Sequence, residues 1–206
     1  MSGEYREHRP SERLQPYVDC FWTRVGRVGA ESRVIPDGAV DIIFDLTARS
    51  PNEAAFVVGT MTRPLLIRSV NESDYVAVRF HPGGAQPLFG HSMRELSDHR
   101  VDLESIWSPQ VASEWMERLR EAGPSEARTR VLERLLVERI QGIQSPEPRV
   151  REAVRRIGTS GGSISTEQLS RELGLTRQHI TRLFDRHVGV GAKFFSRIIR
   201  LRLVLN

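Results

Sequence analysis

The segment 164–189, ISTEQLSRELGLTRQHITRLFDRHVG, constrains the fold more than any other part of the chain because it contains the signals of two short helices and one tight turn. Ser165 followed by Gln168 is a capping box, in which the hydroxyl accepts from the backbone at residue 168 and the amide side chain reaches back to the cap. Gly174 supplies the left-handed residue that ends the first helix. Thr176 caps the next one. Two well-capped helices around a three-residue turn predict a helix-turn-helix arrangement.

The second of these helices has two different sides when it is projected at about 100° per residue. Its apolar side carries Ile180, Leu183 and Phe184. The opposite side has the spacing i, i+3, i+4, i+7 and consists of Gln178, Thr181, Arg182 and Asp185, flanked by Arg177 and Arg186. Glutamine can pair with adenine, arginine with guanine, and a threonine methyl can touch thymine, so this side is typical of a major-groove helix. A solvated polar face is the alternative interpretation, and Asp185 fits the groove poorly.

Charge is distributed unevenly along the chain. Residues 1–145 hold 18 Lys and Arg against 21 Asp and Glu, whereas residues 146–206 hold 12 against 5, a net charge of +7. A basic segment behind a mildly acidic one indicates a unit that binds a polyanion, joined to something else.

Composition excludes several classes of protein. No apolar run approaches the ~20 residues that span a bilayer, and the polar N-terminus lacks a signal-peptide core, so no membrane partner is expected. Cys20 is the only cysteine, which rules out an internal disulfide and favours a reducing, cytoplasmic location.

Three zones follow one another along the chain. Short β-branched and aromatic runs separated by Pro, Gly, Asn and Asp occupy about 17–80 and predict an antiparallel sandwich or barrel. Helical periodicity dominates from about 83 to 143, with Pro109 and Pro124 near two helix starts. The stretch GIQSPEP at 142–148 is the expected linker, and only helices are expected beyond it.

The segment LSRELGLTRQHITRLFDRHVGVGAKFFSRIIRLR, about 169–202, resembles the AraC/XylS family of bacterial transcription regulators. That resemblance implies a DNA-binding module of two helix-turn-helix units joined by a long central helix. It makes Gln178, Thr181 and Arg182 the base-facing residues. Ser165, Thr166 and neighbouring arginines such as Arg177 and Arg186 become candidates for phosphate contact.

The N-terminal part, roughly 14–142, resembles a sensor domain of unstudied ligand that precedes such modules. The pieces that carry this resemblance are PYVDCFWTR, VIPDGAVDIIFDL, FVVGTMTRPLLI, VAVRFHPGGAQPLFG and MRELSDHRVDLESIW. The implied fold class is α+β: an antiparallel, cupin-like barrel or half-barrel plus helices, followed by an all-α helix-turn-helix module. We expect a β-rich sensor over 1–90, a helical connector with a candidate dimer surface over 91–143, and the helix-turn-helix unit with the start of the central helix over 146–206.

The second helix-turn-helix unit of the family has no counterpart, since residues 205 and 206 fall at the end of the central helix. The module is therefore read as incomplete. The expected function is a sequence-specific DNA-binding regulator with double-stranded DNA, a small-molecule effector and a second copy as candidate partners. The alternative is a truncated regulator that no longer binds DNA specifically and acts through its sensor or dimer surface. The apolar side of the last helix is expected to be buried.

No catalytic function, cofactor or metal is expected. The metal-binding HxH motif of cupin enzymes is absent, and His81, His91 and His99 are better explained as structural or solvated side chains. An inert buried thiol is the preferred interpretation of Cys20. Asp41 and Asp45 share one face of a strand. This face is either solvated or faces the interior of a barrel, where the two carboxylates would contact an effector. Trp22, Phe44 and Arg79 are guesses for residues that line an effector pocket. Packing in the core is the alternative interpretation for the two aromatic residues.

Overall fold

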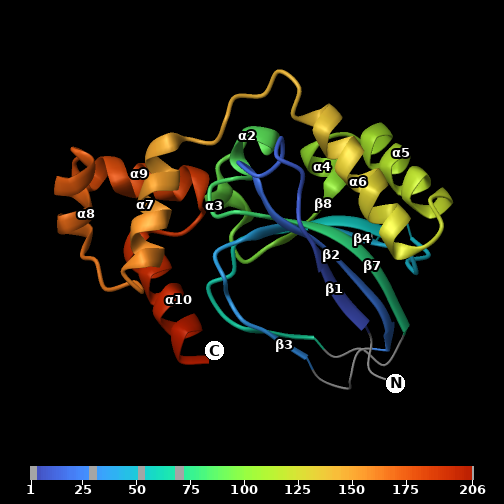
Figure 1. Ribbon diagram of the computed structural model, residues 1–206, viewed down its shortest axis with the longest axis horizontal. Helices are drawn as coiled ribbons and strands as arrows, with labels where there is room; N and C mark the ends of the chain where they lie inside the picture. The colour runs from blue at the N-terminus through green and yellow to red at the C-terminus, as the bar shows by residue number, and fades with distance from the viewer. Residues whose placement is uncertain (1–3, 28–31, 51–53, 68–71, 206) are drawn as a thin grey trace.

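A computed structural model of the chain describes residues 4–27, 32–50, 54–67 and 72–205. Its main feature is a six-stranded, fully antiparallel sheet in the order β1-β2-β7-β4-β5-β8 (Figure 1). A separate two-stranded ribbon pairs β3 with β6. The strands are β1 (Glu4–His8), β2 (Val18–Arg27), β3 (Ser32–Val34), β4 (Val40–Asp45), β5 (Ala55–Val58), β6 (Leu65–Ile67), β7 (Glu72–Phe80) and β8 (Arg100–Asp102).

Alternation along the central strands gives the sheet one buried apolar face. In β4 the even-numbered residues are buried and the odd-numbered ones are partly exposed, as the two-residue period of a strand requires. Phe44 is fully buried and stacks on Trp115 with a ring separation of 6.2 Å. The core of this face therefore forms between the sheet and the helices that follow it.

Five helices complete this part of the chain, which we call the sheet unit (β1–β8 with α2–α6). The two longest, α5 and α6, cover the apolar face, and Arg128 of α6 donates to both carboxylate oxygens of Asp74 in β7 at 2.8 and 2.7 Å (Figure 1). The helices are α2 (Gln86–Phe89), α3 (Met93–Leu96), α4 (Leu103–Ile106), α5 (Pro109–Glu121) and α6 (Ser125–Arg139).

The last four helices form a second unit with its own core, the helical unit: α7 (Pro148–Thr159), α8 (Thr166–Leu173), α9 (Arg177–His187) and α10 (Ala192–Leu205). The segment between α6 and α7 crosses from one unit to the other (Figure 1). The buried cluster of this unit centres on Ile157, Phe184 and Phe195, and the Phe184 and Phe195 rings are 6.1 Å apart. No helix within the described ranges is long and apolar enough to cross a bilayer.

The fold departs from the sequence prediction in three respects. The sheet is open, because β1 and β8 are its edges; this is consistent with the predicted half-barrel but not with a closed barrel or a sandwich. The edge strands β1 and β8 and the short β3 were not predicted, since none carries a strong apolar alternation. The apolar side of α10 was predicted to be buried against the first unit, the sensor or a second copy. Within the single chain Ile198 is buried and Ile199 partly buried, whereas Leu201, Val204 and Leu205 are exposed, so for these three only burial by a second copy is left as a prediction.

Candidate nucleic-acid interface

Local hydrogen bonds fix the two-helix segment as the sequence predicts. The hydroxyl of Ser165 accepts from the backbone N–H of Gln168 at 3.0 Å, and the hydroxyl of Thr176 accepts from that of His179 at 3.2 Å. Gly174 ends α8 with φ of +63°, and its backbone N–H donates to the Arg171 carbonyl. The predicted caps and the left-handed turn are confirmed, and α8 and α9 are short helices joined by residues 174–176.

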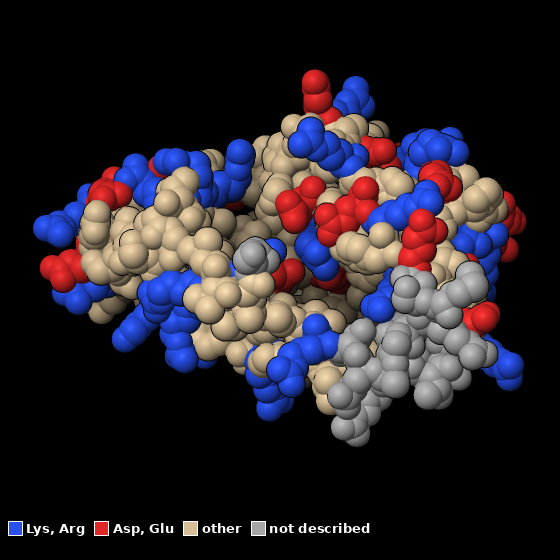
Figure 2. All heavy atoms as spheres, turned by 60° about the horizontal axis from the view of Figure 1, so that its bottom comes forward, with Lys and Arg blue, Asp and Glu red and all other residues tan. Residues whose placement is uncertain are grey.

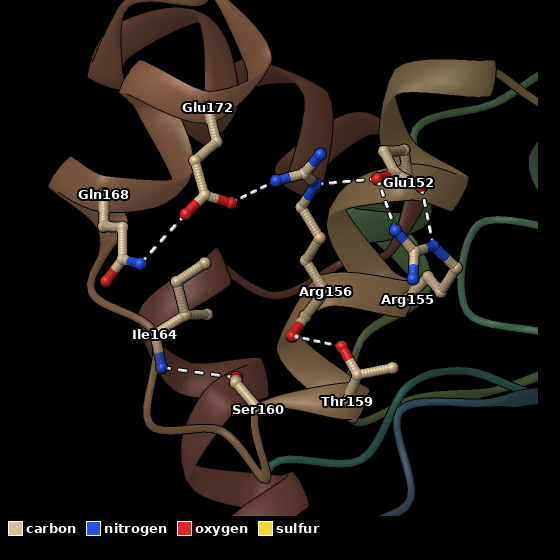
Figure 3. A network of polar contacts seen from close by, with 8 residues as sticks. All are labelled: Glu152, Arg155, Arg156, Thr159, Ser160, Ile164, Gln168 and Glu172. Atoms are coloured by element: carbon tan, nitrogen blue, oxygen red, sulfur yellow. Dashed lines mark hydrogen bonds and ion pairs between the residues drawn. The ribbon is translucent and has the colours of Figure 1, made fainter.

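One detail of the predicted capping box is wrong. The side chain of Gln168 does not return to the cap but donates to Glu172 one turn further along α8, at 2.9 Å. Glu172 is drawn to this position because it also accepts from Arg156 of α7 (Figure 3). The Gln168 amide therefore belongs to a polar network between α7 and α8 and does not cap the start of α8.

This network ties α7 to α8 (Figure 3). Arg156 contacts Glu172 through one nitrogen and donates to Glu152 through Nε at 2.7 Å, while Arg155 forms a bidentate pair with Glu152 at 2.8 and 2.7 Å. Hydrogen bonds from Arg155 and Arg156 lower the pKa of Glu152 to about 2. Exposed ion pairs stabilise a fold only slightly, so the network mainly fixes the direction in which α8 leaves α7.

In the N-terminal half of α9 the polar side of the helix is exposed, as predicted. Ile180 and Phe184 are buried, whereas Gln178 and Thr181 on the opposite side are exposed. The Thr181 hydroxyl donates to the Arg177 carbonyl at 3.0 Å, which leaves its methyl group to contact a ligand. This half of α9 is accessible from solvent.

The other predicted contact residues occupy two places. Ser165 and Thr166 lie at the N-terminus of α8, where Ser165 is exposed and Thr166 partly buried. Arg182 and Arg186 are exposed, but both line a cleft between α9 and the sheet unit. The structure thus separates the predicted set into a free N-terminal group on α9, a group at the start of α8, and an arginine pair beside the sheet unit.

The C-terminal end of α9 is held by the sheet unit. Arg94 of α3 pairs with Asp185, with 2.9 Å between Nη1 and Oδ1. Hydroxyl groups of the sheet unit then donate to backbone carbonyls at this end of α9: Ser92 to Asp185 O (3.2 Å), Thr60 to Val188 O (2.6 Å) and Ser97 to Gly189 O (2.7 Å). The last carbonyls of a helix lack partners within the helix, so these hydroxyls act as its cap.

Sequence reasoning missed this second set of residues. Thr60, Ser92, Arg94 and Ser97 are ordinary polar residues in a segment without a recognisable motif, and they meet α9 across about 90 to 130 positions of sequence. The one available signal was Asp185, an acidic residue on a face otherwise suited to DNA. Its pairing with Arg94 explains that misfit.

Lys and Arg side chains surround the helical unit, whereas acidic and basic side chains alternate over the sheet unit (Figure 2). The count of 12 Lys and Arg against 5 Asp and Glu in residues 146–206 gives the same asymmetry. Of the five acids, Glu152 and Glu172 are paired with arginines inside the network, and Asp185 is paired with Arg94. The remaining arginines give the unit a positive potential that attracts polyanions.

A second polar cluster lies on the face of the sheet opposite α5 and α6. Arg79 contacts Asp41 (Nε to Oδ1, 3.2 Å), Asp37 (3.6 Å) and Glu7 (3.8 Å). Burial raises the pKa of Asp41 to about 6 in spite of the opposing effect of the Arg79 charge. Of the guessed pocket residues, Trp22 and Arg79 lie on this face, whereas Phe44 belongs to the core on the other side.

Cys20 and the predicted histidines fall in ordinary environments. Cys20 is buried beside Trp22, and burial is the main reason that its pKa rises to about 12, which makes the thiol unreactive. His81 lies 3.6 Å from Asp19, and the ring of His99 contacts the Ser97 carbonyl at 2.7 Å. Within the described ranges, no three His, Cys, Asp or Glu side chains are grouped to hold a metal ion.

The chain is similar to one protein family and to one solved structure described below. Residues 6–102, just under half of the chain, match the model of a family described as a domain of unknown function (DUF6597). No curated protein matches the chain. A solved structure described as that of the AraC-like transcriptional activator CuxR is similar over 99% of this chain and 94% of its own, at 14% identity and a TM-score of 0.30. A likeness at that TM-score carries no argument about fold or function.

Proposed function

We propose that the chain is a sequence-specific DNA-binding transcription regulator of the AraC/XylS type, in which α8 and α9 form a helix-turn-helix unit. The observation that carries this proposal is the exposed N-terminal half of α9, where Arg177, Gln178 and Thr181 project from a well-capped helix whose other side is buried. In helix-turn-helix proteins the N-terminal residues of the second helix contact base edges.

The contacts of this unit would divide into base reading and backbone positioning. Gln178 can bond an adenine edge through its amide, and the methyl group of Thr181 can touch thymine. The N-terminus of α8, with Ser165 and Thr166, offers backbone N–H groups and hydroxyls to a phosphate. The net charge of +7 over residues 146–206 supplies the non-specific attraction.

In this proposal the sheet unit is a cupin-like half-barrel sensor that responds to a small effector or to a second copy of the chain. The polar cluster on the face opposite α5 and α6 supports a response because it connects directly to the helical unit. Asp37 pairs with Arg79 inside the cluster, and its neighbour Gly38 lies against the ring of Phe195 in α10. A change in the cluster would therefore displace the backbone on which α10 rests.

A specific observation favours one alternative, a regulator that binds DNA only non-specifically and acts through its sensor. The C-terminal half of α9 faces the sheet unit, with Asp185 paired to Arg94 and Arg182 lining the cleft. A major groove about 12 Å wide accommodates little more than one helix of about 10–12 Å, so the sheet unit would limit how deeply α9 enters. The Kd for DNA would then stay in the non-specific range of about 10⁻⁴–10⁻⁶ M.

Selection from a random pool of duplexes, followed by salt titration of the selected and a scrambled duplex, separates the two functions. Sequence-specific reading predicts that Gln178→Ala weakens binding to the selected duplex by about 1–3 kcal/mol and relaxes preference at one base position. Gln110→Ala, at an exposed position of α5, is the matched control and should change nothing. If no sequence is enriched, or if the selected and the scrambled duplex bind with equal affinity, sequence-specific reading is excluded and the non-specific alternative is supported.

A further inference from the structure

A cleft of about 870 Å³ separates helix α9 from helix α2 of the sheet unit, with the segment between α6 and α7 as its third wall. An adjoining hollow of about 400 Å³ shares Gly90, Arg182 and Arg186 with it. The main cleft by itself falls within the size range of sites that bind small organic molecules. It lies between the two units, so anything bound there contacts both.

Helix α9 turns one continuous row of side chains toward this cleft. The row has the spacing i, i+3, i+4, i+7, i+8, which places its members on one side of a helix, and it consists of His179, Arg182, Leu183, Arg186 and His187. Arg182 and Arg186 are exposed, and neither forms an ion pair or a side-chain hydrogen bond with any other described residue. Residues four apart are neighbours on a helix surface, so the two guanidinium groups can grip one anion together.

The opposite wall contributes a neutral donor. Gln86 is only 8% exposed, lines the cleft, and its side-chain amide forms no hydrogen bond with any other described residue. The nitrogen and oxygen of this amide stay open to solvent, so they can bond a polar group that enters the cleft. On the α9 side, Nδ1 of His187 is buried and has no hydrogen-bond partner among the described residues.

The rest of the lining determines what kind of anion fits. Pro87, Ile143 and Leu183 give the cleft an apolar portion beside the arginines. Among the described residues that line the main cleft, Glu147 is the one acidic side chain, and it accepts from the backbone N–H of Arg149 at 3.3 Å. The lining therefore combines positive charge, an amide that is free to bond a ligand and an apolar surface, which suits an organic anion with an apolar body.

We propose that this cleft binds a small organic anion between Gln86 of α2 and the Arg182–Arg186 pair of α9. The bound anion bridges the two units and holds α9 against the sheet unit. Arg182 also belongs to the face assigned to DNA, so the anion and DNA compete for it. This consequence rests on the proposed DNA-binding function, whereas binding of the anion itself does not.

Titration of the full chain with phenyl phosphate, followed by backbone amide NMR, tests the site directly. Phenol serves as the uncharged probe of the same shape. Saturable shifts confined to residues of α2, α9 and 143–148, with phenyl phosphate but not with phenol, are expected. Absence of saturable shifts at millimolar phenyl phosphate, or shifts spread over the Arg-rich surface, overturns the proposal.

Variants identify the groups that bind. Gln86→Leu and the exposed Arg186→Gln should each weaken phenyl phosphate binding at least about fivefold. Arg151→Gln, at an exposed position of α7 outside the cleft, should leave it unchanged. Equal affinity in all three variants contradicts the assignment. Because Arg186 is exposed, that variant keeps the test decisive even if Gln86→Leu fails to fold.

Competition with DNA is measured separately. Saturating phenyl phosphate should lower affinity for the selected duplex about 5–150-fold, the usual range of coupling between two sites, and Gln86→Leu should abolish this effect while leaving DNA affinity itself unchanged. Unchanged affinity for DNA under saturating probe overturns the competition. If the chain binds no DNA at all, the proposed function fails, whereas the NMR titration still decides whether the cleft binds the anion.

Discussion

The ring of Phe195 lies so close to Gly38 that a Cβ atom built on this glycine would stand 2.4 Å from Phe195 Cε2. Gly38 also has φ of +81°, a conformation that side-chain-bearing residues rarely adopt. The contact joins the turn before β4 to α10, and so joins the sheet unit to the helical unit. This contact, one of several between the units, depends on the absence of a side chain at residue 38.

The first prediction follows from this contact. Gly38→Ala should destabilise the chain by at least about 1 kcal/mol more than Gly123→Ala, as measured by urea denaturation followed by circular dichroism. Gly123 is a matched control because its φ is +80° and nothing lies within 4 Å of a Cβ built there. Equal losses in the two variants would mean that Phe195 does not rest on Gly38 in solution.

The second prediction concerns the pair between Arg94 and Asp185. A double-mutant cycle with Arg94→Ala and Asp185→Ala should give a coupling free energy of about 0.2–1 kcal/mol, because the arginine is largely exposed. The coupling should shrink as salt is raised, since exposed charges are screened. Zero coupling at low ionic strength would show that the two side chains do not meet.

The third prediction concerns Asp41, whose pKa burial raises from 3.8 to about 6. The folded chain holds this proton more tightly than the unfolded chain, so the contribution of Asp41 to stability is lost as pH rises from about 4 to about 6. Asp41→Asn should remove a slope of up to about 3 kcal/mol over that interval. Urea denaturation of both proteins across this range measures the difference.

Glu117→Gln, an exposed position of α5, controls for the general effect of removing a carboxylate. Its stability should follow the same pH dependence as the unaltered chain. If Asp41→Asn and Glu117→Gln behave alike, burial does not govern the titration of Asp41.

The fourth prediction tests the turn between α8 and α9. Gly174→Val should destabilise the chain by more than about 1 kcal/mol, and the reason is conformational alone, since nothing lies within 4 Å of a Cβ at this position. Asparagine tolerates the left-handed region better, so Gly174→Asn should cost clearly less. Thermal melts of the two variants give the comparison, and a Val variant with an unshifted midpoint would rule out the turn.

Sequence reasoning succeeded where the determinant is local. Ser165, Gly174 and Thr176 act within one or two helical turns of their own positions, so their types and spacing were enough to predict two helices and the turn between them. The strong β-branched runs likewise predicted the central strands β4 and β7. In each case the residues that form the structure are the residues that show the pattern.

Sequence reasoning failed where the interacting residues are far apart in the sequence. Arg94 and Asp185 are 91 positions apart, and neither has a neighbour that indicates the other. The sheet is open because β1 and β8 lie at its two edges, and the composition of these short strands does not indicate that position. The cleft is formed by three segments remote from one another, so Gln86 and Arg186 could be recognised as a pair only once the chain was folded.

The hydroxyls that cap α9 have a consequence for how such chains can be recombined. Thr60, Ser92 and Ser97 satisfy carbonyls that belong to another unit, so a helical unit grafted onto a foreign partner would leave those carbonyls without protein donors. In chimaeras that exchange α7–α10 alone, the C-terminal end of α9 should therefore be more mobile. In chimaeras that also transfer the segment 60–97, it should stay ordered. The end of α9 therefore depends on donors that the helical unit does not contain.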